Sequence, residues 1–292
     1  MDITLALGGG GSRGNAHIGV IRRLEHEGFR IRGVAGTSFG GIVGVFYAAG
    51  YRPNDLEEMF AGLDQRSLYG HGPEDGPSLI GYAGVRQSLV NLLGDRTFAS
   101  LPIPFAVTAT DLKSGSEVVL SSGRLVEAIL ATIAMPGIFP ARHIGDRELV
   151  DGGTLDPVPV GPARALAPHL PVIAVSLTPP IGSAARTWSV PLPAFVPRAL
   201  VDRFSRMRYG LMLDVVMRSM DISNRAVTEY RLQMDKPDVI IRPRVGNIDT
   251  LDVINVPEVI KIGEEAVDEV LPQLRQKFTL RNRIRRALGA KA

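Results

Sequence analysis

The chain has 292 residues, enough for one large α/β domain or two small ones, and its 45% hydrophobic content supports a buried core. It has no cysteine, which excludes disulfides, thiol nucleophiles and cysteine-ligated metals and is typical of a reducing compartment. The net charge of +3 is a mild basic bias. We expect no signal peptide, because a strand pattern begins at once, and no membrane-spanning helix, because no window of ~18 residues is uninterruptedly apolar.

The first part of the chain predicts a strand, a glycine loop, a helix and a second strand. Apolar residues alternate from Ile3 to Leu7, which is typical of a strand. Four glycines, Gly8 to Gly11, end that strand and allow backbone angles closed to other residues. Apolar residues then recur at helical spacing from Ala16 to Glu27, and Ile31 to Ala35 predicts a second buried strand.

The second strand runs into a G-x-S-x-G pattern formed by Gly36, Ser38 and Gly40. When this pattern joins a strand to a helix, the turn is so tight that the serine hydroxyl is exposed for attack. A chance match is the alternative in a chain with 32 glycines. Here a buried strand precedes the pattern and a helix over 41–49 follows it. The context therefore predicts that Ser38 is a nucleophile.

The glycine loop has three candidate roles. Gly9, Gly11 and Gly14 fit the dinucleotide fingerprint, but that function needs an acidic residue at the end of the second strand, which is absent. A phosphate-binding P-loop needs Lys-Ser/Thr after the glycines, and Arg13 does not supply it. The third role is an oxyanion hole, in which backbone amides at a helix start face a developing negative charge. We favour this role because a serine nucleophile requires it.

The middle of the chain alternates between helices and strands. A helix is expected over 53–63, and the polar, glycine-rich residues 64–84 predict a lid over an acyl-binding cleft. Further expected elements are a helix over 85–93, strands over 104–111 and 116–120, a helix over 125–135, and strands over 148–150 and 171–177. Asp151 follows one of these strands and precedes Gly152 and Gly153, which by themselves indicate only a turn.

The C-terminal third is less regular. Prolines around Trp188 interrupt regular structure over 178–200, and a long helix is expected over 202–232. A strand over 238–242 and a helix opened by a capping box at Asn255 and Glu258 follow. The basic tail, 281–292, favours a solvated helix, with a peripheral membrane anchor or a nucleic-acid contact as alternatives.

Three motifs, at 8–14, 36–40 and 151–153, resemble those of patatin-like phospholipases, most closely the compact bacterial members. The resemblance covers roughly residues 3–177. It implies a dyad in which Ser38 is the nucleophile and Asp151 the base, without a histidine. The remaining residues that it implies are the oxyanion donors Gly9, Gly10 and Gly11, joined by the Phe39 amide, and the motif residues Arg13, Gly14, Gly36, Gly40, Gly152 and Gly153.

The dyad can be weighed against a triad with histidine, which an ordinary α/β-hydrolase would place after the acid. Four of the five histidines precede Asp151 in the chain. Only His169 follows it, and His169 enters the strand over 171–177. That position places it at the edge of the sheet opposite to a site built at strand C-terminal ends. The sequence therefore predicts no catalytic histidine.

We expect a three-layer α/β/α sandwich with a mostly parallel central sheet, a patatin-like catalytic domain over 3–177, and a C-terminal extension over 178–292 packed on the same domain. The expected function is serine-dependent hydrolysis of lipid acyl esters, with phospholipids or lysophospholipids as the implied substrates. No cofactor, metal or nucleic acid is expected, and the oligomeric state is left open. We expect a cytoplasmic protein, with peripheral contact with an anionic membrane as a further expectation. A catalytically idle acyl-binding or regulatory protein and a nucleotide-binding protein stay open as alternatives.

Overall fold

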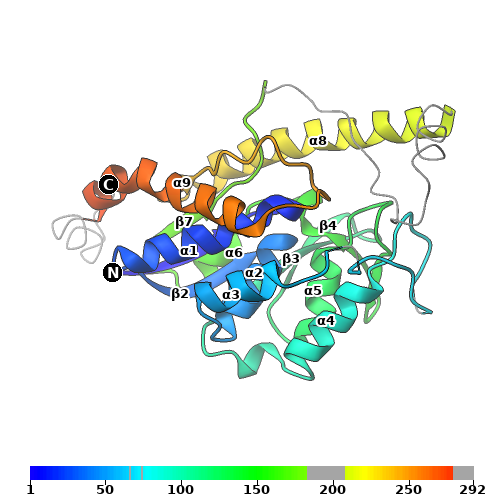
Figure 1. Ribbon diagram of the computed structural model, residues 1–292, viewed down its shortest axis with the longest axis horizontal. Coiled ribbons are helices and arrows are strands. Elements are labelled where there is room, and N and C mark those ends of the chain that lie inside the picture. The colour runs from blue at the N-terminus through cyan, green and yellow to red at the C-terminus, as the bar shows by residue number, and fades with distance from the viewer. Residues whose placement is uncertain (66, 74, 183–207, 279–292) are drawn as a thin grey trace.

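The computed structural model describes residues 1–65, 67–73, 75–182 and 208–278. Within these residues the predicted three-layer fold is confirmed: helices cover both faces of a central sheet (Figure 1). The segment around Trp188 and the basic tail over 281–292 lie outside the described residues.

The larger part of the sheet is parallel, as expected. Its strands pair in the spatial order β8, β7, β1, β2, β3, all parallel, so their carboxyl ends meet at one edge. Their bounds are β1 Asp2–Leu7, β2 Arg30–Gly36, β3 Phe105–Asp111, β7 Val172–Val175 and β8 Val239–Ile241.

An antiparallel part extends the sheet beyond β3. β3 pairs with β2 through its first residues and with β6 through its last ones, while β4 pairs with it antiparallel. β5 pairs antiparallel with β6 at the edge. These strands are β4 Ser116–Leu120, β5 Arg142–Ile144 and β6 Arg147–Asp151.

The helices divide between the two faces according to the hydrophobic clusters that they join. One face carries α1 Ala16–His26, α2 Phe39–Ala48, α3 Pro53–Ala61, α4 Ala83–Leu93, α5 Leu125–Thr132 and α9 Val256–Lys277. The other carries α6 Val160–Leu166 and the end of the long α8 Arg208–Asp235, whose Met217 belongs to the first cluster. Short 3₁₀ turns are η1 Gly11–Asn15, η2 Phe98–Ser100 and η3 Gly152–Thr154.

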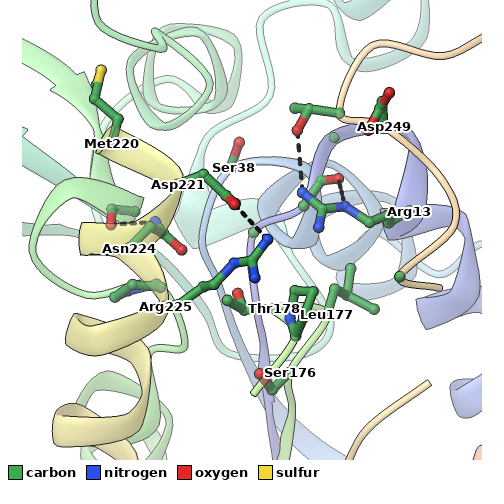
Figure 2. Close-up of a pocket in the computed structure, with 18 of the residues that line it drawn as sticks. Arg13, Ser38, Ser176, Leu177, Thr178, Met220, Asp221, Asn224, Arg225 and Asp249 are labelled. Atoms are coloured by element: carbon green, nitrogen blue, oxygen red, sulfur yellow. Dashed lines mark hydrogen bonds and ion pairs between the residues drawn. The ribbon is translucent and has the colours of Figure 1, made fainter. Parts of the chain in front are cut away.

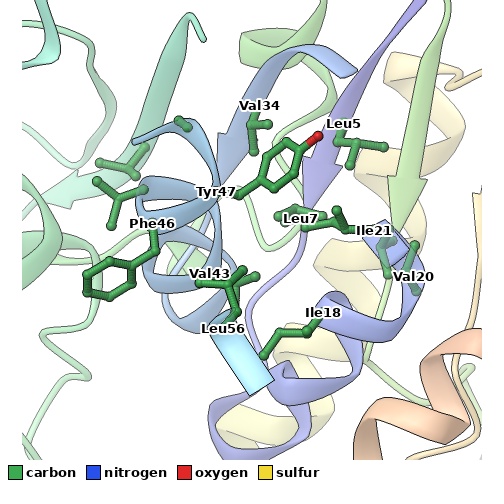
Figure 3. Close-up of a cluster of buried hydrophobic side chains, with 14 of the residues drawn as sticks. Leu5, Leu7, Ile18, Val20, Ile21, Val34, Val43, Phe46, Tyr47 and Leu56 are labelled. Atoms are coloured by element: carbon green, nitrogen blue, oxygen red, sulfur yellow. The ribbon is translucent and has the colours of Figure 1, made fainter. Parts of the chain in front are cut away.

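Alternation along β1 decides which side chains reach each face. Ile3, Leu5 and Leu7 point into the large cluster beneath α1 and α2 (Figure 3). Ala6 points to the other face, where the neighbouring strands also contribute alanines beneath α6. Small residues on this face let α6 lie close to the sheet, and the branched residues on the opposite face fill the deeper core.

The C-terminal elements belong to the same sheet and core. β8 pairs with β7, and α9 packs against α1. The two helices approach closely at glycines, because a Cβ added to Gly19 would lie 1.9 Å from the carbonyl oxygen of Ile260. The helix expected after Asn255 is confirmed, but its capping box is not: the Asn255 side chain donates to the Glu258 side chain at 2.8 Å and caps no backbone amide.

Candidate functional site

Ser38 lies in a strained turn between β2 and α2. Its φ of 53° and ψ of −124° are unusual for a residue with a side chain, and among the described non-glycine residues only Lys236 shares a positive φ. Such strain persists only where the surrounding structure imposes it, and it is typical of functional sites. The turn exposes the Ser38 hydroxyl at the carboxyl edge of the sheet.

Two glycines make the turn possible. A Cβ added to Gly36 would lie 2.5 Å from the carbonyl oxygen of Gly40, and one added to Gly40 would lie 2.2 Å from the carbonyl oxygen of Leu7. Neither position has room for a methyl group, because the neighbouring atoms are backbone. The G-x-S-x-G spacing is therefore a steric requirement of this strand-to-helix turn.

The backbone amide of Ser38 is held by a residue that the sequence did not indicate. It donates a hydrogen bond to Oγ1 of Thr132, at the end of α5, over 2.9 Å. Thr132 is fully buried. This bond fixes the orientation of the turn.

Asp151 ends β6 beside Ser38. Its amide donates to the carbonyl oxygen of Ala134 at 2.9 Å, and its Oδ1 accepts from the Gly153 amide at 2.7 Å. Burial raises the pKa of Asp151 from 3.8 to about 6, although hydrogen bonds from the Ser38 hydroxyl and the Gly153 amide lower it in part. The structure thus brings the predicted nucleophile and the predicted base together.

The turn after Asp151 is as crowded as the turn at Ser38. A Cβ added to Gly152 would lie 2.3 Å from Oγ1 of Thr108, which itself lies 2.7 Å from Oγ1 of Thr37, next to Ser38. Asn224 of α8 donates to the Gly153 carbonyl at 2.9 Å. The turns at Ser38 and Asp151 are therefore connected through the contact between Thr37 and Thr108. α8 holds the second turn through Asn224.

The first peptide of the glycine loop is fixed at both ends. The Gly9 amide donates to the Pro157 carbonyl at 3.0 Å, and Nε2 of His17 lies 2.7 Å from the Gly8 carbonyl oxygen. Burial lowers the pKa of His17 to about 4, so the ring is neutral and donates to Gly8 through Nε2–H. Because the Gly9 amide already donates to Pro157, it is removed from the expected oxyanion donors. Gly10, Gly11 and Phe39 are left.

Arg13 fixes the next peptide. Its Nε donates to the Gly10 carbonyl at 3.0 Å and its Nη2 to Oγ1 of Thr250 at 3.1 Å. In a trans peptide the C=O and the N–H point in opposite directions, so this bond turns the Gly11 amide away from Arg13. Within the described part of the chain, the amides of Gly10, Gly11 and Phe39 donate to no backbone carbonyl.

Two cavities meet at Ser38. The larger, about 740 Å³, also contains Asp151 and the glycine loop and is bounded by α8 (Figure 2). The smaller, about 140 Å³, is lined mainly by apolar side chains, among them Phe39, Phe60 and Leu89. An ester placed at Ser38 would thus have a larger space that contains several arginines on one side and a small apolar space on the other.

Residues of the predicted lid form part of the apolar wall. Tyr69 stacks on Phe139 with ring centroids 6.0 Å apart, and the fully buried Tyr82 donates to the Pro140 carbonyl at 3.2 Å. The backbone amide of Ile80 donates to the Ile138 carbonyl at 2.8 Å. The described residues of 64–84 therefore cover the apolar cavity, and their opening and closing as a lid stays a prediction.

Asp156 is a buried acid that lies outside both cavities. Its carboxylate is fully buried and lies 3.1 Å from Nη2 of Arg231 on α8, and its carbonyl accepts from Oγ1 of Thr37 at 2.8 Å. Burial raises the pKa of Asp156 to about 7, with Arg231 opposing that shift. This residue ties α8 to the turn at Ser38 and, in this position, supports the site without facing it.

All five histidines lie in described parts of the chain, and none lines either cavity. His169, the histidine with the chain order of a triad, is exposed before β7. Among the described residues there is also no cluster of His, Asp and Glu suited to a metal ion. No helix in the described ranges combines the length and the apolar character needed to cross a bilayer.

The sequence is similar to a known protein family and to several of its relatives. The family model described as "Patatin-like phospholipase" matches residues 5–164, more than half of the chain. An uncharacterised NTE family protein of Mycobacterium tuberculosis is 38% identical over 177 residues, which cover 60% of this chain and 49% of that protein. A second one from the same organism is 27% identical and covers 92% of this chain and 46% of its own length.

A fungal relative carries a functional name. Lysophospholipase NTE1 of Pyricularia oryzae is 27% identical, over 96% of this chain but 19% of its own length. The chain thus spans about half, or less, of the curated relatives that it matches. In fold it is similar to VipD of Legionella pneumophila, with a TM-score of 0.57 and 14% identity over 93% of this chain and 66% of that one.

Proposed function

Because the chain belongs to the patatin-like phospholipase family, we propose that it is a serine hydrolase that cleaves acyl esters of lipids with a Ser38–Asp151 dyad. The observation that carries the proposal is the strained turn at Ser38, next to a buried carboxylate whose pKa is about 6. A catalytically idle acyl-binding protein would have no need for this strain.

Asp151 acts as the general base in this proposal. A carboxylate with an ordinary pKa is a weak base for a serine hydroxyl, and burial raises the pKa of Asp151 towards neutrality. It takes the proton as Ser38 Oγ attacks the ester carbonyl, then donates it to the leaving alcohol. Water, activated by the same carboxylate, attacks the acyl-enzyme and releases the fatty acid.

The glycine loop stabilises the tetrahedral intermediate. We assign the oxyanion to the Gly10 and Gly11 amides, with the Phe39 amide at the start of α2 as a third donor. Arg13 supports this arrangement by holding the Gly10 carbonyl, which orients the amide of the following residue. The donors are thus positioned before the substrate arrives, which is the condition for a large electrostatic contribution to rate.

The apolar cavity takes the acyl chain. It opens at Ser38 and is lined by aromatic and aliphatic residues of α2, α3, α4 and the segment over 64–84. Burying methylene groups there is favourable by about 0.8 kcal/mol each, so chain length within the cavity contributes to binding. The name of the fungal relative favours a lysophospholipid as substrate.

Hydrolysis of 1-acyl lysophospholipids by the purified protein tests this proposal. Release of fatty acid should be lost in Ser38→Ala and kept in a variant such as Gly161→Ala, where an added methyl meets no atom within 4 Å. A Ser38→Ala variant that is folded and fully active would show that another group is the nucleophile. Peripheral contact with an anionic membrane through the basic tail remains a separate proposal.

A further inference from the structure

The larger cavity beside Ser38 contains several arginines among otherwise largely apolar residues. Its charged lining comes from the glycine loop, α8 and the segment after β8, and comprises Arg13, Arg218, Arg225, Arg242, Arg244, Asp151, Asp221 and Asp249. The arginines outnumber the carboxylates, and one of the carboxylates is the proposed base. Arg242 and Arg244 also pair with Glu229 and Glu269 outside the lining, so an anionic occupant would depend mainly on the remaining arginines.

Arg225 is more deeply buried than Arg218 and Arg231 of the same helix. It is 6% exposed, and Figure 2 shows its guanidinium extending from α8 into the cavity. Its Nη2 lies 2.5 Å from Oδ2 of Asp221, one turn earlier on the same helix. A guanidinium is a planar fork of donors that matches the oxygens of a phosphate, so a phosphate in this cavity would compete with Asp221 for Arg225.

Two further arginines of the lining pair with carboxylates outside it. Nη2 of Arg242 lies 2.8 Å from Glu229, and Nη2 of Arg244 lies 3.0 Å from Glu269, with the Arg244 side chain 82% exposed. Arg13 is engaged with the glycine loop. Arg225 is the residue chosen for testing because it is buried and its guanidinium extends into the cavity (Figure 2).

We propose that this cavity is the subsite for the phosphate of the leaving alcohol, with Arg225 as the specificity-determining residue. The inference rests on the proposed function, because it takes an ester whose carbonyl lies at Ser38 and whose acyl chain fills the apolar cavity. The alcohol portion must then occupy the arginine-lined side. The preferred substrate is a single-chain lipid with a net negative phosphate head, ahead of zwitterionic and neutral lipids of the same chain.

The test compares three lipids with one short acyl chain, used as monomers: 1-acyl-glycerol 3-phosphate, the phosphocholine lysolipid and the monoacylglycerol. We expect kcat/KM for the phosphate lipid to exceed that for the other two by about tenfold or more, as for one charge-assisted contact. The ratio of the phosphate lipid to the monoacylglycerol should fall about tenfold in Arg225→Gln, mainly through KM. It should be partly restored in Arg225→Lys.

Asp221→Asn is the matched variant, because it removes the carboxylate that competes with the substrate for Arg225. The same ratio should rise in this variant. If the Arg225–Asp221 pair served only to hold α8, both variants would change activity on all three lipids together and leave the ratio unmoved. An unchanged ratio in Arg225→Gln, or equal rates on all three lipids in the wild type, would overturn the headgroup subsite.

Binding to the Ser38→Ala protein separates this inference from the proposed function, since it needs no turnover. Calorimetry should detect glycerol 3-phosphate in Ser38→Ala and show at least tenfold weaker binding in the double variant with Arg225→Gln. Inorganic phosphate that binds as tightly as glycerol 3-phosphate would identify a site for free phosphate and contradict the headgroup assignment. Failure of the proposed function would appear separately, as no hydrolysis of any of the three lipids by the wild type.

Discussion

Replacing Asp151 by Asn should remove activity while making the folded protein more stable at neutral pH. The pKa of Asp151 is raised from 3.8 to about 6 by burial, so the folded state holds the proton more tightly than the unfolded state. Its ionisation therefore opposes folding as pH rises from 3.8 through 6. A difference of about 2 units corresponds to about 3 kcal/mol at 1.36 kcal/mol per unit, present in full above pH 7.

Asn has the same shape and still accepts from the Gly153 amide, but it carries no charge and cannot accept the Ser38 proton. The free energy of unfolding of Asp151→Asn, measured by urea titration from pH 4 to pH 8, should rise relative to the wild type by up to about 3 kcal/mol across that range. Turnover should fall by about 10²–10⁴, the usual contribution of a general base. In the wild type, kcat/KM should rise with pH to a plateau above about pH 6.

Asp111→Asn provides a control of the opposite sign. The hydroxyl of Ser114 and nearby amides lower the pKa of Asp111, so its charge favours folding above the pKa of the unfolded chain. Removing it should reduce stability most at neutral pH. If Asp151→Asn instead loses stability as pH rises, as Asp111→Asn should, then Asp151 is not a carboxylate whose charge is disfavoured by burial, and the basis for its role as a base is lost.

Three further predictions concern the loop and the tail. Gly10→Ala places a Cβ 2.9 Å from Cδ1 of Leu177, so it should displace the loop and lower kcat by about 10²–10³ with little change in KM, whereas Gly161→Ala should change neither. His17→Phe leaves the buried Gly8 carbonyl without its donor, so the free energy of unfolding should fall by about 1–3 kcal/mol and turnover should also fall. Thermal melting and activity assays measure the two effects, and a variant as stable and active as the wild type would exclude a positioning role for His17. Deleting residues 281–292 should remove only weak, salt-sensitive binding to anionic vesicles in sedimentation, and retention at high salt would contradict an electrostatic contact.

Elements with a strong local pattern could be predicted from the sequence. β1, α1 and β2 begin and end within one or two residues of their expected bounds, because alternation or helical spacing agrees there with the turn residues. α6 and β5 were not predicted. α6, Val160–Leu166, contains Gly161 and Pro162 and forms because it packs on the alanine face of the sheet, which no local pattern reveals.

The motifs identified the residues of the proposed dyad, but the groups that support them depend on tertiary contacts. Thr132 reaches Ser38 across 94 positions of the chain, and Arg225 enters the cavity only because α8 crosses the carboxyl edge of the sheet. Even within one motif, the sequence does not show which amides face the substrate: the Gly9 amide donates to Pro157, whereas those of Gly10 and Gly11 donate to no backbone carbonyl. The spacing of motif residues indicates which residues lie at the site. The positions of segments distant in the chain decide which of their atoms face the substrate.

The central claim is that Ser38 is an activated nucleophile, and covalent labelling by a fluorophosphonate probe tests it most directly. We predict one labelled peptide, with the adduct on Ser38 by mass spectrometry and a labelling rate that rises with pH through about 6, the pKa of Asp151. Ser176→Ala is the control, because Ser176 lines the same cavity but is buried, and this variant should label as the wild type does. Absence of labelling in the folded wild type, or an adduct that persists in Ser38→Ala, would contradict the account.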